Sequence, residues 1–163
     1  MPRPRKPAAL AGTLAVLLAL AAYYLLSPEP APGYRFCTRV IDGDTIELEG
    51  GERVRLIGVN TPEKNDARAE VRQLAAAATE FTRRLSEGRR VRLEYDRERQ
   101  DRYGRTLAYV FLEDGAFVNV QIVRQGYGFA YTRFPFRYRE NFRAYEREAR
   151  QSGRGLWAGT RFP

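Results

Sequence analysis

The chain has 163 residues, of which 28 are lysine or arginine and 20 are aspartate or glutamate, so its net charge is +8. It contains no histidine and a single cysteine, Cys37. Histidine-based catalysis, an internal disulfide bond and a zinc site of histidine and cysteine ligands are therefore excluded, and any bound metal must use oxygen ligands. The positive charge favours polyanionic partners such as nucleic acid or anionic lipid.

Residues 1–33 predict a membrane anchor followed by a spacer. A basic flank, residues 3–6, precedes an uncharged stretch over residues 8–26. A helix of that length spans about 28 Å, roughly the hydrocarbon thickness of a bilayer. We expect a single-pass anchor whose basic flank stays in the cytoplasm, with the rest of the chain outside the cytoplasm at the cell membrane; the alternative is a cleaved signal peptide and a secreted protein. Proline-rich residues 27–33 predict an extended spacer before a domain over residues 34–163.

The domain shows both strand-like and helix-like periodicities. Apolar alternation or short apolar runs predict five strands, over residues 36–41, 46–48, 54–59, 91–95 and 107–112. Apolar residues three and four apart predict three helices, over residues 66–87, 118–125 and 138–149. Gly50-Gly51 predicts a two-residue hairpin loop, and Cys37 is expected to be a small buried hydrophobe. Five strands with one helix after the third predict an α+β, mainly β fold: a five-stranded oligonucleotide-binding (OB) Greek-key barrel with three helices.

Two segments bring acids and an arginine toward one place. Residues 42–45 (Asp-Gly-Asp-Thr) form a tight turn between the first two strands, and the third strand carries Arg55 and ends in residues 60–63 (Asn-Thr-Pro-Glu). Hard oxygen ligands beside an arginine are what a metal-assisted phosphate site needs. Phosphodiester chemistry is therefore the leading hypothesis. Taken singly, the turn could be an ordinary hairpin and Glu63 a solvated acid at a strand end.

The chain resembles the staphylococcal nuclease (thermonuclease) family over about residues 34–158. Four motifs carry the resemblance: Asp-Gly-Asp-Thr at 42–45, Arg-Leu-Ile-Gly-Val-Asn-Thr-Pro-Glu at 55–63, Asp-Arg-Tyr-Gly-Arg at 101–105 and Gly-Arg-Gly-Leu-Trp at 153–157. Each motif is weak alone, but the four in this order and spacing are specific. The resemblance implies a monomeric, calcium-dependent nuclease that acts on DNA and RNA, with a preference for single strands, and leaves 3′-phosphate ends.

The resemblance also assigns metal ligands. It makes Asp44 the calcium carboxylate, together with Asn60 and the main-chain carbonyl of Thr61, while Asp42 orients a ligand or a water. The family usually has aspartate where this chain has Asn60, so the site loses one negative charge. Calcium affinity is expected to fall, or metal selectivity to shift, because a carboxamide oxygen still binds a hard cation but brings no charge.

The catalytic groups implied by the resemblance are Arg55, Glu63 and Arg105. Glu63 would act as general base or position the attacking water. Arg55 and Arg105 would hold the phosphate, because a guanidinium presents two parallel donors to phosphate oxygens. Arg55 lies inside an apolar strand, where an arginine is unusual, and this favours a functional role. The assignment of Arg105 depends on the resemblance alone.

Substrate contacts are implied for Tyr103, Tyr131 and Arg133, by stacking on a base or by bonding to phosphate. Packing at the barrel rim is the alternative for the two tyrosines. The family usually has a second tyrosine where this chain has Arg133. Four further arginines could follow a phosphate backbone or form a solvated face, and we favour the solvated face: Arg102, Arg137, Arg139 and Arg143.

Two other functions fit parts of the sequence. Barrels of this family that lack the catalytic groups only bind nucleic acid, so a non-catalytic binding module is the main alternative. A structural domain at the membrane would fit the anchor and the basic charge. The joint presence of Arg55, Glu63 and Arg105 favours the enzyme.

Overall fold

The computed structural model describes residues 16–18 and 33–159. The chain separates into two units, residues 1–32 and residues 33–163. Apart from residues 16–18, the expected anchor lies outside the described residues. Within the part that is described, no helix combines the length and the apolar character that crossing a membrane requires.

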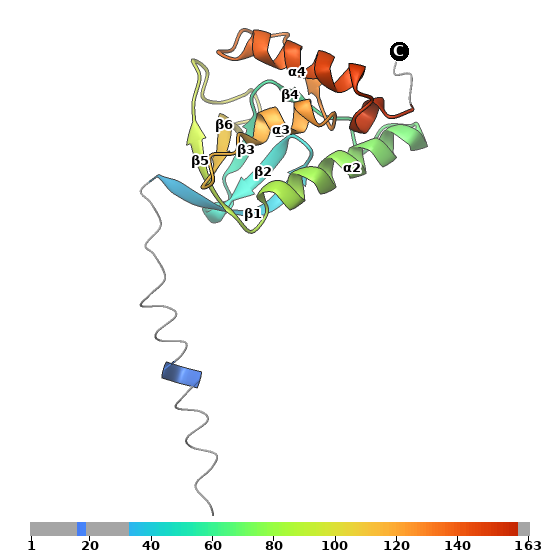
Figure 1. Cartoon of the computed structure of the whole chain (residues 1–163). Helices are drawn as coiled ribbons and strands as arrows, with labels where there is room; N and C mark the ends of the chain where they lie inside the picture. Colours follow the sequence, from blue (N-terminus) through green and yellow to red (C-terminus); the bar gives the residue numbers. More distant parts are fainter. Residues whose placement is uncertain (1–15, 19–32, 160–163) are drawn as a thin grey trace, which may run out of the picture. The chain divides into compact units, whose positions relative to one another are not determined.

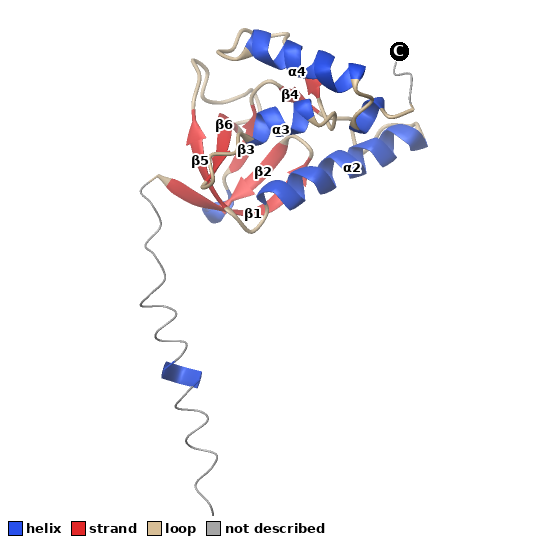
Figure 2. Ribbon diagram, in the orientation of Figure 1, coloured by secondary structure: helices blue, strands red, loops and turns tan. Residues whose placement is uncertain are grey.

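Residues 33–159 fold into a closed barrel, coloured by secondary structure in Figure 2. The strands are β1 (Tyr34–Asp42), β2 (Thr45–Leu48), β3 (Arg53–Leu56), β4 (Val59–Asn60), β5 (Arg90–Glu94), β6 (Thr106–Leu112) and β7 (Phe129–Ala130). The barrel order is β1-β2-β3-β6-β5, and a separate two-stranded sheet pairs β4 with β7. Only the β3–β6 pair of the barrel is parallel. The predicted five-stranded barrel is confirmed.

Three helices cover the barrel, as predicted for this part of the chain: α2 (Ala69–Ser86), α3 (Val118–Arg124) and α4 (Arg139–Gln151). Helices α2 and α4 run along opposite sides of the domain, and α3 lies between them and packs against both (Figure 1). Helix α2 begins three residues later than predicted. The Asp66 carboxylate accepts the main-chain N–H of Arg68 at 2.9 Å, and this local bond stabilises a turn in place of the first helical residues.

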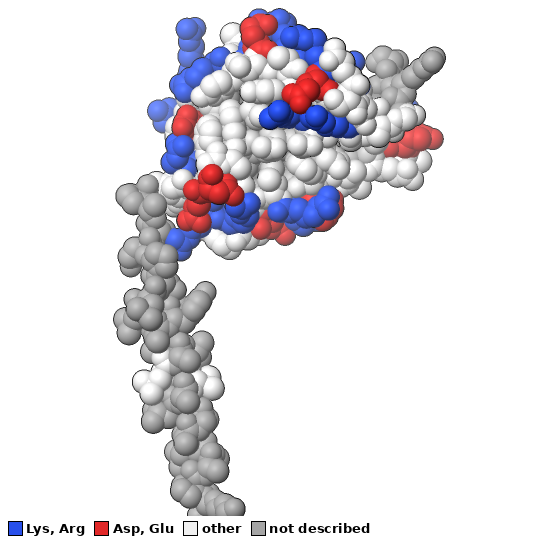
Figure 3. All heavy atoms as spheres, viewed as in Figure 1, with Lys and Arg blue, Asp and Glu red and all other residues white. Residues whose placement is uncertain are grey.

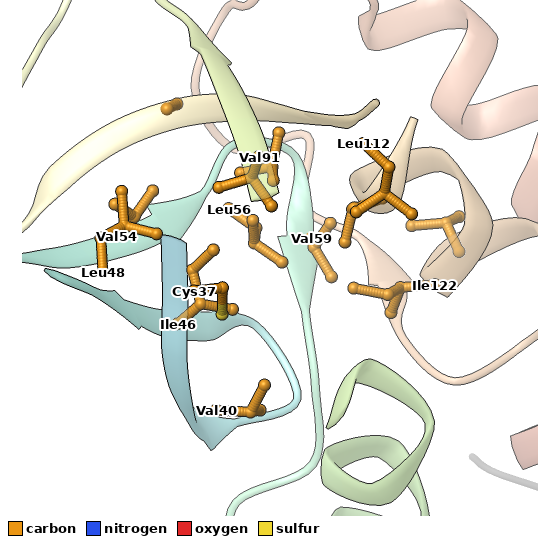
Figure 4. Packing of buried hydrophobic residues seen from close by; sticks show 14 of the residues in the cluster. Cys37, Val40, Ile46, Leu48, Val54, Leu56, Val59, Val91, Leu112 and Ile122 are labelled. Atoms are coloured by element: carbon orange, nitrogen blue, oxygen red, sulfur yellow. The ribbon is translucent and has the colours of Figure 1, made fainter. Parts of the chain in front are cut away.

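The barrel interior is filled by aliphatic side chains. Figure 4 shows them converging from the strands and from α3, and the labelled residues are all at most 4% exposed: Cys37, Val40, Ile46, Leu48, Val54, Leu56, Val59, Val91, Leu112 and Ile122. Burying each such side chain contributes about 1.5–3 kcal/mol to folding. Burial also raises the pKa of the Cys37 thiol to about 11, so this cysteine is a structural hydrophobe, as predicted.

The prediction of one continuous third strand over residues 54–59 was wrong. Strand β3 ends at Leu56, and Gly58, with φ +77°, turns the chain out of the barrel. A Cβ at Gly58 would lie 2.8 Å from the ring of Phe136, so glycine is required for close packing as well as for the turn. The carbonyl of Gly58 accepts the N–H of Tyr131 at 2.9 Å. The turn therefore places Val59 and Asn60 beside β7 and the loop that follows β7.

The prediction of a two-residue loop at Gly50-Gly51 was also wrong. The loop is a three-residue 3-10 turn, Glu49–Gly51, closed by the N–H of Leu48 donating to the carbonyl of Glu52 at 2.9 Å. The glycine pair correctly marks the position of the loop, but the loop also includes the preceding residue, Glu49.

Asn119 of α3 fixes the break between β3 and β4. Its side chain is fully buried, and its amide nitrogen donates to the carbonyls of Ile57 and Ala108 at 3.0 and 3.1 Å. Its amide oxygen accepts the N–H of Val110 at 2.9 Å. One side chain thus ties the helix, the turn and β6 together.

We expect Asn119→Leu to lower the free energy of unfolding by about 2–4 kcal/mol, because three main-chain groups lose this partner and two of those bonds are buried. Urea unfolding of the chain measures the change. Asn141→Leu, at an exposed position of α4, is the matched control and should have little effect. Equal unfolding midpoints for Asn119→Leu and the control would contradict the bracing role.

Candidate active site

A cleft of about 900 Å³ opens where the β1–β2 turn, the β3–β4 break and two loops meet. It is lined by all ten residues that the sequence singled out: Asp42, Asp44, Arg55, Asn60, Thr61, Glu63, Tyr103, Arg105, Tyr131 and Arg133. These residues come from segments as far apart in the sequence as Asp42 and Arg133. The fold therefore brings the whole predicted set to one place.

The β1–β2 turn is pressed against helix α2. A Cβ at Gly43 would lie 2.7 Å from Cγ2 of Thr61 and 2.9 Å from Cβ of Ala78. The carbonyl of Gly43 accepts the hydroxyl of Thr82 at 2.8 Å. Only glycine fits here, and its close approach fixes the position of the acids on either side.

Asp44 is the centre of a buried hydrogen-bond network. Its Oδ2 forms an ion pair with Nη2 of Arg55 at 3.1 Å. The same oxygen accepts hydrogen bonds from the N–H of Thr61 at 2.9 Å and from the hydroxyl of Thr61 at 3.2 Å. Its Oδ1 accepts the hydroxyl of Thr45 at 3.1 Å. Asp42 in turn accepts the main-chain N–H of Asp44 at 3.1 Å. The turn, β3 and the segment after β4 thus converge on one carboxylate.

The environment of Asp44 leaves its negative charge incompletely compensated. Burial raises the pKa of Asp44 to about 6, Arg55 acts to lower it, and the neighbouring Asp42 acts to raise it. Desolvation therefore outweighs the arginine. A bound cation would stabilise the ionised carboxylate at this position.

This shift predicts a pH dependence of stability. The folded-state pKa of Asp44 lies above the ordinary value of about 3.9, so the folded chain binds the proton more readily than the unfolded chain. The contribution of Asp44 to stability is therefore largest at low pH and is lost as the pH rises from about 4 to about 6. Thermal unfolding in a chelator should show the wild type losing stability relative to Asp44→Asn across that range; a constant difference would contradict the shift.

Arg55 is held rigidly at the end of β3. Its side chain is 14% exposed, and its Nη1 donates to the carbonyls of Leu56 and Val59 at 2.9 and 2.7 Å. Together with the bond to Asp44, these contacts fix the guanidinium plane. An arginine fixed in advance can stabilise charge that develops during a reaction without reorganising.

Arg105 is positioned by Asp101, a residue that sequence analysis did not assign to the site. Both Nε and Nη2 of Arg105 lie 2.7 Å from Oδ2 of Asp101. Oδ1 of Asp101 accepts the N–H groups of Tyr103 and Arg105 at 2.9 and 3.0 Å. Burial acts to raise the pKa of Asp101, but these bonds outweigh it and lower the pKa. The signal was an aspartate opening a glycine turn four residues before an arginine.

Glu63 and Asn60 present polar groups to the cleft from the chain that leaves the barrel. Glu63 is exposed and follows Pro62, and no ion pair or side-chain hydrogen bond holds it within residues 33–159. Asn60 is partly buried in β4, opposite Phe129 of β7. Both side chains remain available to a substrate, a water or a cation.

Aromatic rings stand at the mouth of the cleft. Tyr103 is 67% exposed, with the guanidinium carbons of Arg102 and Arg105 over its ring at 4.7 and 5.4 Å. Phe134 also lines the cleft; it is 57% exposed, and its ring centroid lies 6.0 Å from that of Tyr131. Phe134 was not among the predicted site residues, because the sequence around it does not show that its ring is exposed.

The donors available to a metal are oxygens. In the part of the chain that the structure describes, no three acidic, histidine or cysteine side chains form a metal-binding group. A cation in the cleft would depend on the carboxylates of Asp42 and Asp44, the oxygens of Asn60 and Thr61, and water. Calcium accepts six to eight such oxygens, including carboxamide and main-chain ones. These oxygen donors fit calcium, although few of them carry a negative charge. The Asp44 charge, which Arg55 balances only in part, would favour a cation beside it.

The excess positive charge does not form one continuous field on the face shown in Figure 3. Lysine and arginine atoms are interspersed with acidic ones around the margin, and a broad uncharged area lies between them. On this face, phosphate binding would therefore depend on particular arginines more than on a uniform surface potential.

A family model described as Staphylococcal nuclease homologue matches residues 53–159, more than half of the chain. The matched region includes eight of the ten predicted site residues that line the cleft, and it leaves out Asp42 and Asp44.

Individual relatives agree with this match. The chain is 53% identical to the Thermonuclease of Staphylococcus intermedius over 91 residues, which cover 54% of each protein, so it spans about half the length of that relative. It is 37% identical to the Thermonuclease of Staphylococcus hyicus over 124 residues, 74% of this chain and 73% of that protein. It is 30% identical to Endonuclease YhcR of Bacillus subtilis over 152 residues, 82% of this chain and 12% of that protein. The chain belongs to the staphylococcal nuclease family.

Proposed function

We propose that the chain is a calcium-dependent nuclease that hydrolyses phosphodiester bonds of DNA and RNA, prefers single strands and leaves 3′-phosphate ends. Its family and the thermonucleases and endonucleases among its relatives support a hydrolase of this class. The observation that carries the proposal is the cleft in which the buried Asp44–Arg55 pair, Glu63 and Arg105 meet.

Calcium would be held by Asp44, Asn60 and Thr61, with Asp42 fixing the turn through the N–H of Asp44. When bound, the cation supplies positive charge that neutralises a phosphate oxygen. Asp44 must be ionised for this, and the nearby Arg55 favours that form.

The chain's own residues account for the remaining chemistry. Arg55 and Arg105 donate hydrogen bonds to the non-bridging oxygens, where negative charge accumulates as the phosphorus becomes five-coordinate. Glu63 accepts a proton from the attacking water and directs it at phosphorus. The bond to the 5′ oxygen breaks, that oxygen takes up a proton from solvent to become the 5′ hydroxyl, and the phosphate stays on the 3′ end.

Base contacts would come from the two walls of the cleft. Tyr103 and Tyr131 offer rings for stacking, and Arg133 offers a cation to a base or a phosphate. Stacking on a ring face does not depend on base identity, and a base is free to stack only when the strand is unpaired. This arrangement supports the preference for single strands and action on both DNA and RNA.

The test is an incubation of the full chain with single-stranded DNA and RNA in calcium and in a chelator. Cleavage in calcium, absent in the chelator, with 3′-phosphate ends on the products, is expected. Binding of the same substrates without cleavage under both conditions would replace the enzyme by the non-catalytic binding module.

We also propose that residues 8–26 anchor the chain, as a monomer, in the cell membrane with the nuclease domain outside the cytoplasm. The full-length protein should then sediment with membranes, resist extraction by carbonate and act on nucleic acid added to intact cells. Most of the activity in a soluble form that starts between residues 28 and 34 would instead establish cleavage of a signal peptide.

A further inference from the structure

A second hollow of about 620 Å³ lies beside the catalytic cleft. It is lined by Tyr95, Asp96, Arg97, Pro135, Phe136 and Arg137. Four of these residues, all except Tyr95 and Arg137, also line the cleft. The two hollows therefore adjoin along a shared wall, where a strand leaving the cleft would pass.

Asp96 builds this hollow by joining its two loops. Its Oδ2 accepts the main-chain N–H of Arg137 at 2.8 Å and the hydroxyl of the buried Tyr109, and its Oδ1 accepts the N–H of Arg97 at 2.9 Å. Burial acts to raise the pKa of Asp96, but these hydrogen bonds outweigh it and lower the pKa. The carboxylate is thus ionised and bonded to the protein, and the two loops are held together before any ligand arrives.

The side chains around the hollow combine positive charge with an aromatic ring. Arg137 is 54% exposed, and the carboxylate nearest to its Nη1, that of Glu94, is 3.8 Å away. Arg97 is exposed, and none of the ion pairs among residues 33–159 involves it. The guanidinium carbon of Arg99 lies 4.6 Å from the ring centroid of Tyr95. The Tyr95 ring is partly buried against the core and forms the floor of the hollow, so the exposed arginines are the groups that could contact a strand. Arginines along a groove are the feature that tracks the phosphate backbone of a single strand without sequence preference.

We propose that this hollow is an extended subsite that binds the nucleotides following the phosphate in the catalytic cleft, on one continuous single strand. The proposal rests on the proposed function for the identity of the ligand, and adds that Arg137 contacts a phosphate remote from the cleaved bond. Because barrels of this type cover about 4–16 nucleotides, a strand longer than the cleft is an expected ligand.

Arg137→Ala tests the subsite, with Arg147→Ala, an exposed arginine of α4 outside both hollows, as the matched loss of one positive charge. The full chain is titrated in a chelator, which prevents cleavage, with a fluorescent trinucleotide and with an oligothymidylate of about twelve nucleotides. Arg137→Ala should weaken binding of the long strand about fivefold and lower its salt slope by about 0.7, the value for one lost phosphate contact on a single strand. Its affinity for the trinucleotide should match that of the control.

Equal affinities of Arg137→Ala and Arg147→Ala for the long strand would overturn the subsite. A loss of binding to phosphatidylglycerol vesicles with unchanged oligonucleotide affinity would overturn it in favour of a lipid surface. The length dependence is measured without cleavage, so it is separate from the proposed catalysis. A wild-type chain that shows the length effect but does not cut DNA in calcium would refute the nuclease and leave the subsite standing.

Discussion

Arg55→Ala should lower turnover on single-stranded DNA by roughly a hundredfold or more, the scale for losing one preorganised group that stabilises a transition state. Arg55 is fixed by Asp44 and by the carbonyls of Leu56 and Val59 before substrate binds. Its donors therefore need no reorganisation when charge develops on phosphate. Single-turnover rates at saturating calcium and substrate measure the effect.

Removing Arg55 also has a structural consequence, because the buried Asp44 loses its cationic partner. The pKa of Asp44, which Arg55 acts to lower, should rise further. Arg55→Lys keeps a charge near Asp44 but loses the planar pair of donors. A large loss of turnover in Arg55→Lys with near-wild-type thermal stability would assign the effect to phosphate. Near-wild-type turnover in Arg55→Ala would contradict the mechanism.

Glu63→Gln separates catalysis from folding more cleanly. Glu63 is exposed, and within the described residues its side chain bonds to no other, so the substitution should leave stability unchanged. A carboxamide cannot accept the water's proton, so turnover should again fall roughly a hundredfold. If the variant cleaves at the wild-type rate, another group must activate the water.

The main elements of the barrel could be predicted because their signals are local. Alternation gave five strands, and apolar spacing gave the helix that crosses from the third strand to the next. The break after Leu56 could not be predicted this way. Apart from Arg55, residues 54–59 form an unbroken stretch without a polar side chain, and the turn at residues 57–58 is stabilised by Tyr131 and by Asn119, which lie far along the chain. A two-residue strand such as β4 has too short a pattern to be read from sequence.

The residues that line the cleft were easier to predict than the hydrogen bonds and ion pairs that hold them in position. The motifs and the family resemblance together selected ten residues that all line one cleft. The motifs could not reveal that Asp101 fixes Arg105, or that Asp96 joins two loops through Tyr109 and the N–H of Arg137. Those roles depend on which face of each side chain meets which loop, and that is decided by the tertiary packing. Phe134 was not predicted for a related reason, because the solvent exposure of one aromatic ring cannot be read from the sequence.

Asn60→Asp should tighten calcium binding by about tenfold. In the part of the chain that the structure describes, no three acidic, histidine or cysteine side chains are grouped so that they could hold a metal, so a cation beside Asp42 and Asp44 would have few charged ligands. Calcium affinity rises with the number of charged ligands. A new carboxylate at contact distance attracts a cation by several kcal/mol at an effective dielectric near 20, of which desolvation removes a large part. A net gain of about 1.4 kcal/mol corresponds to the tenfold change.

The measurement is calorimetric titration of calcium into the substrate-free chain, at fixed salt, for the wild type and Asn60→Asp. Asn65→Asp is the matched control, because it adds the same charge to an exposed residue of the same cleft wall. A general field effect would strengthen binding equally in both variants, whereas a direct ligand acts only at Asn60. Turnover can move either way, since a cation bound by one more carboxylate carries less net charge to polarise phosphate. If Asn60→Asp leaves calcium affinity at the level of the control, Asn60 does not contact the metal, and the site must be rebuilt around Asp42, Asp44 and the oxygens of Thr61.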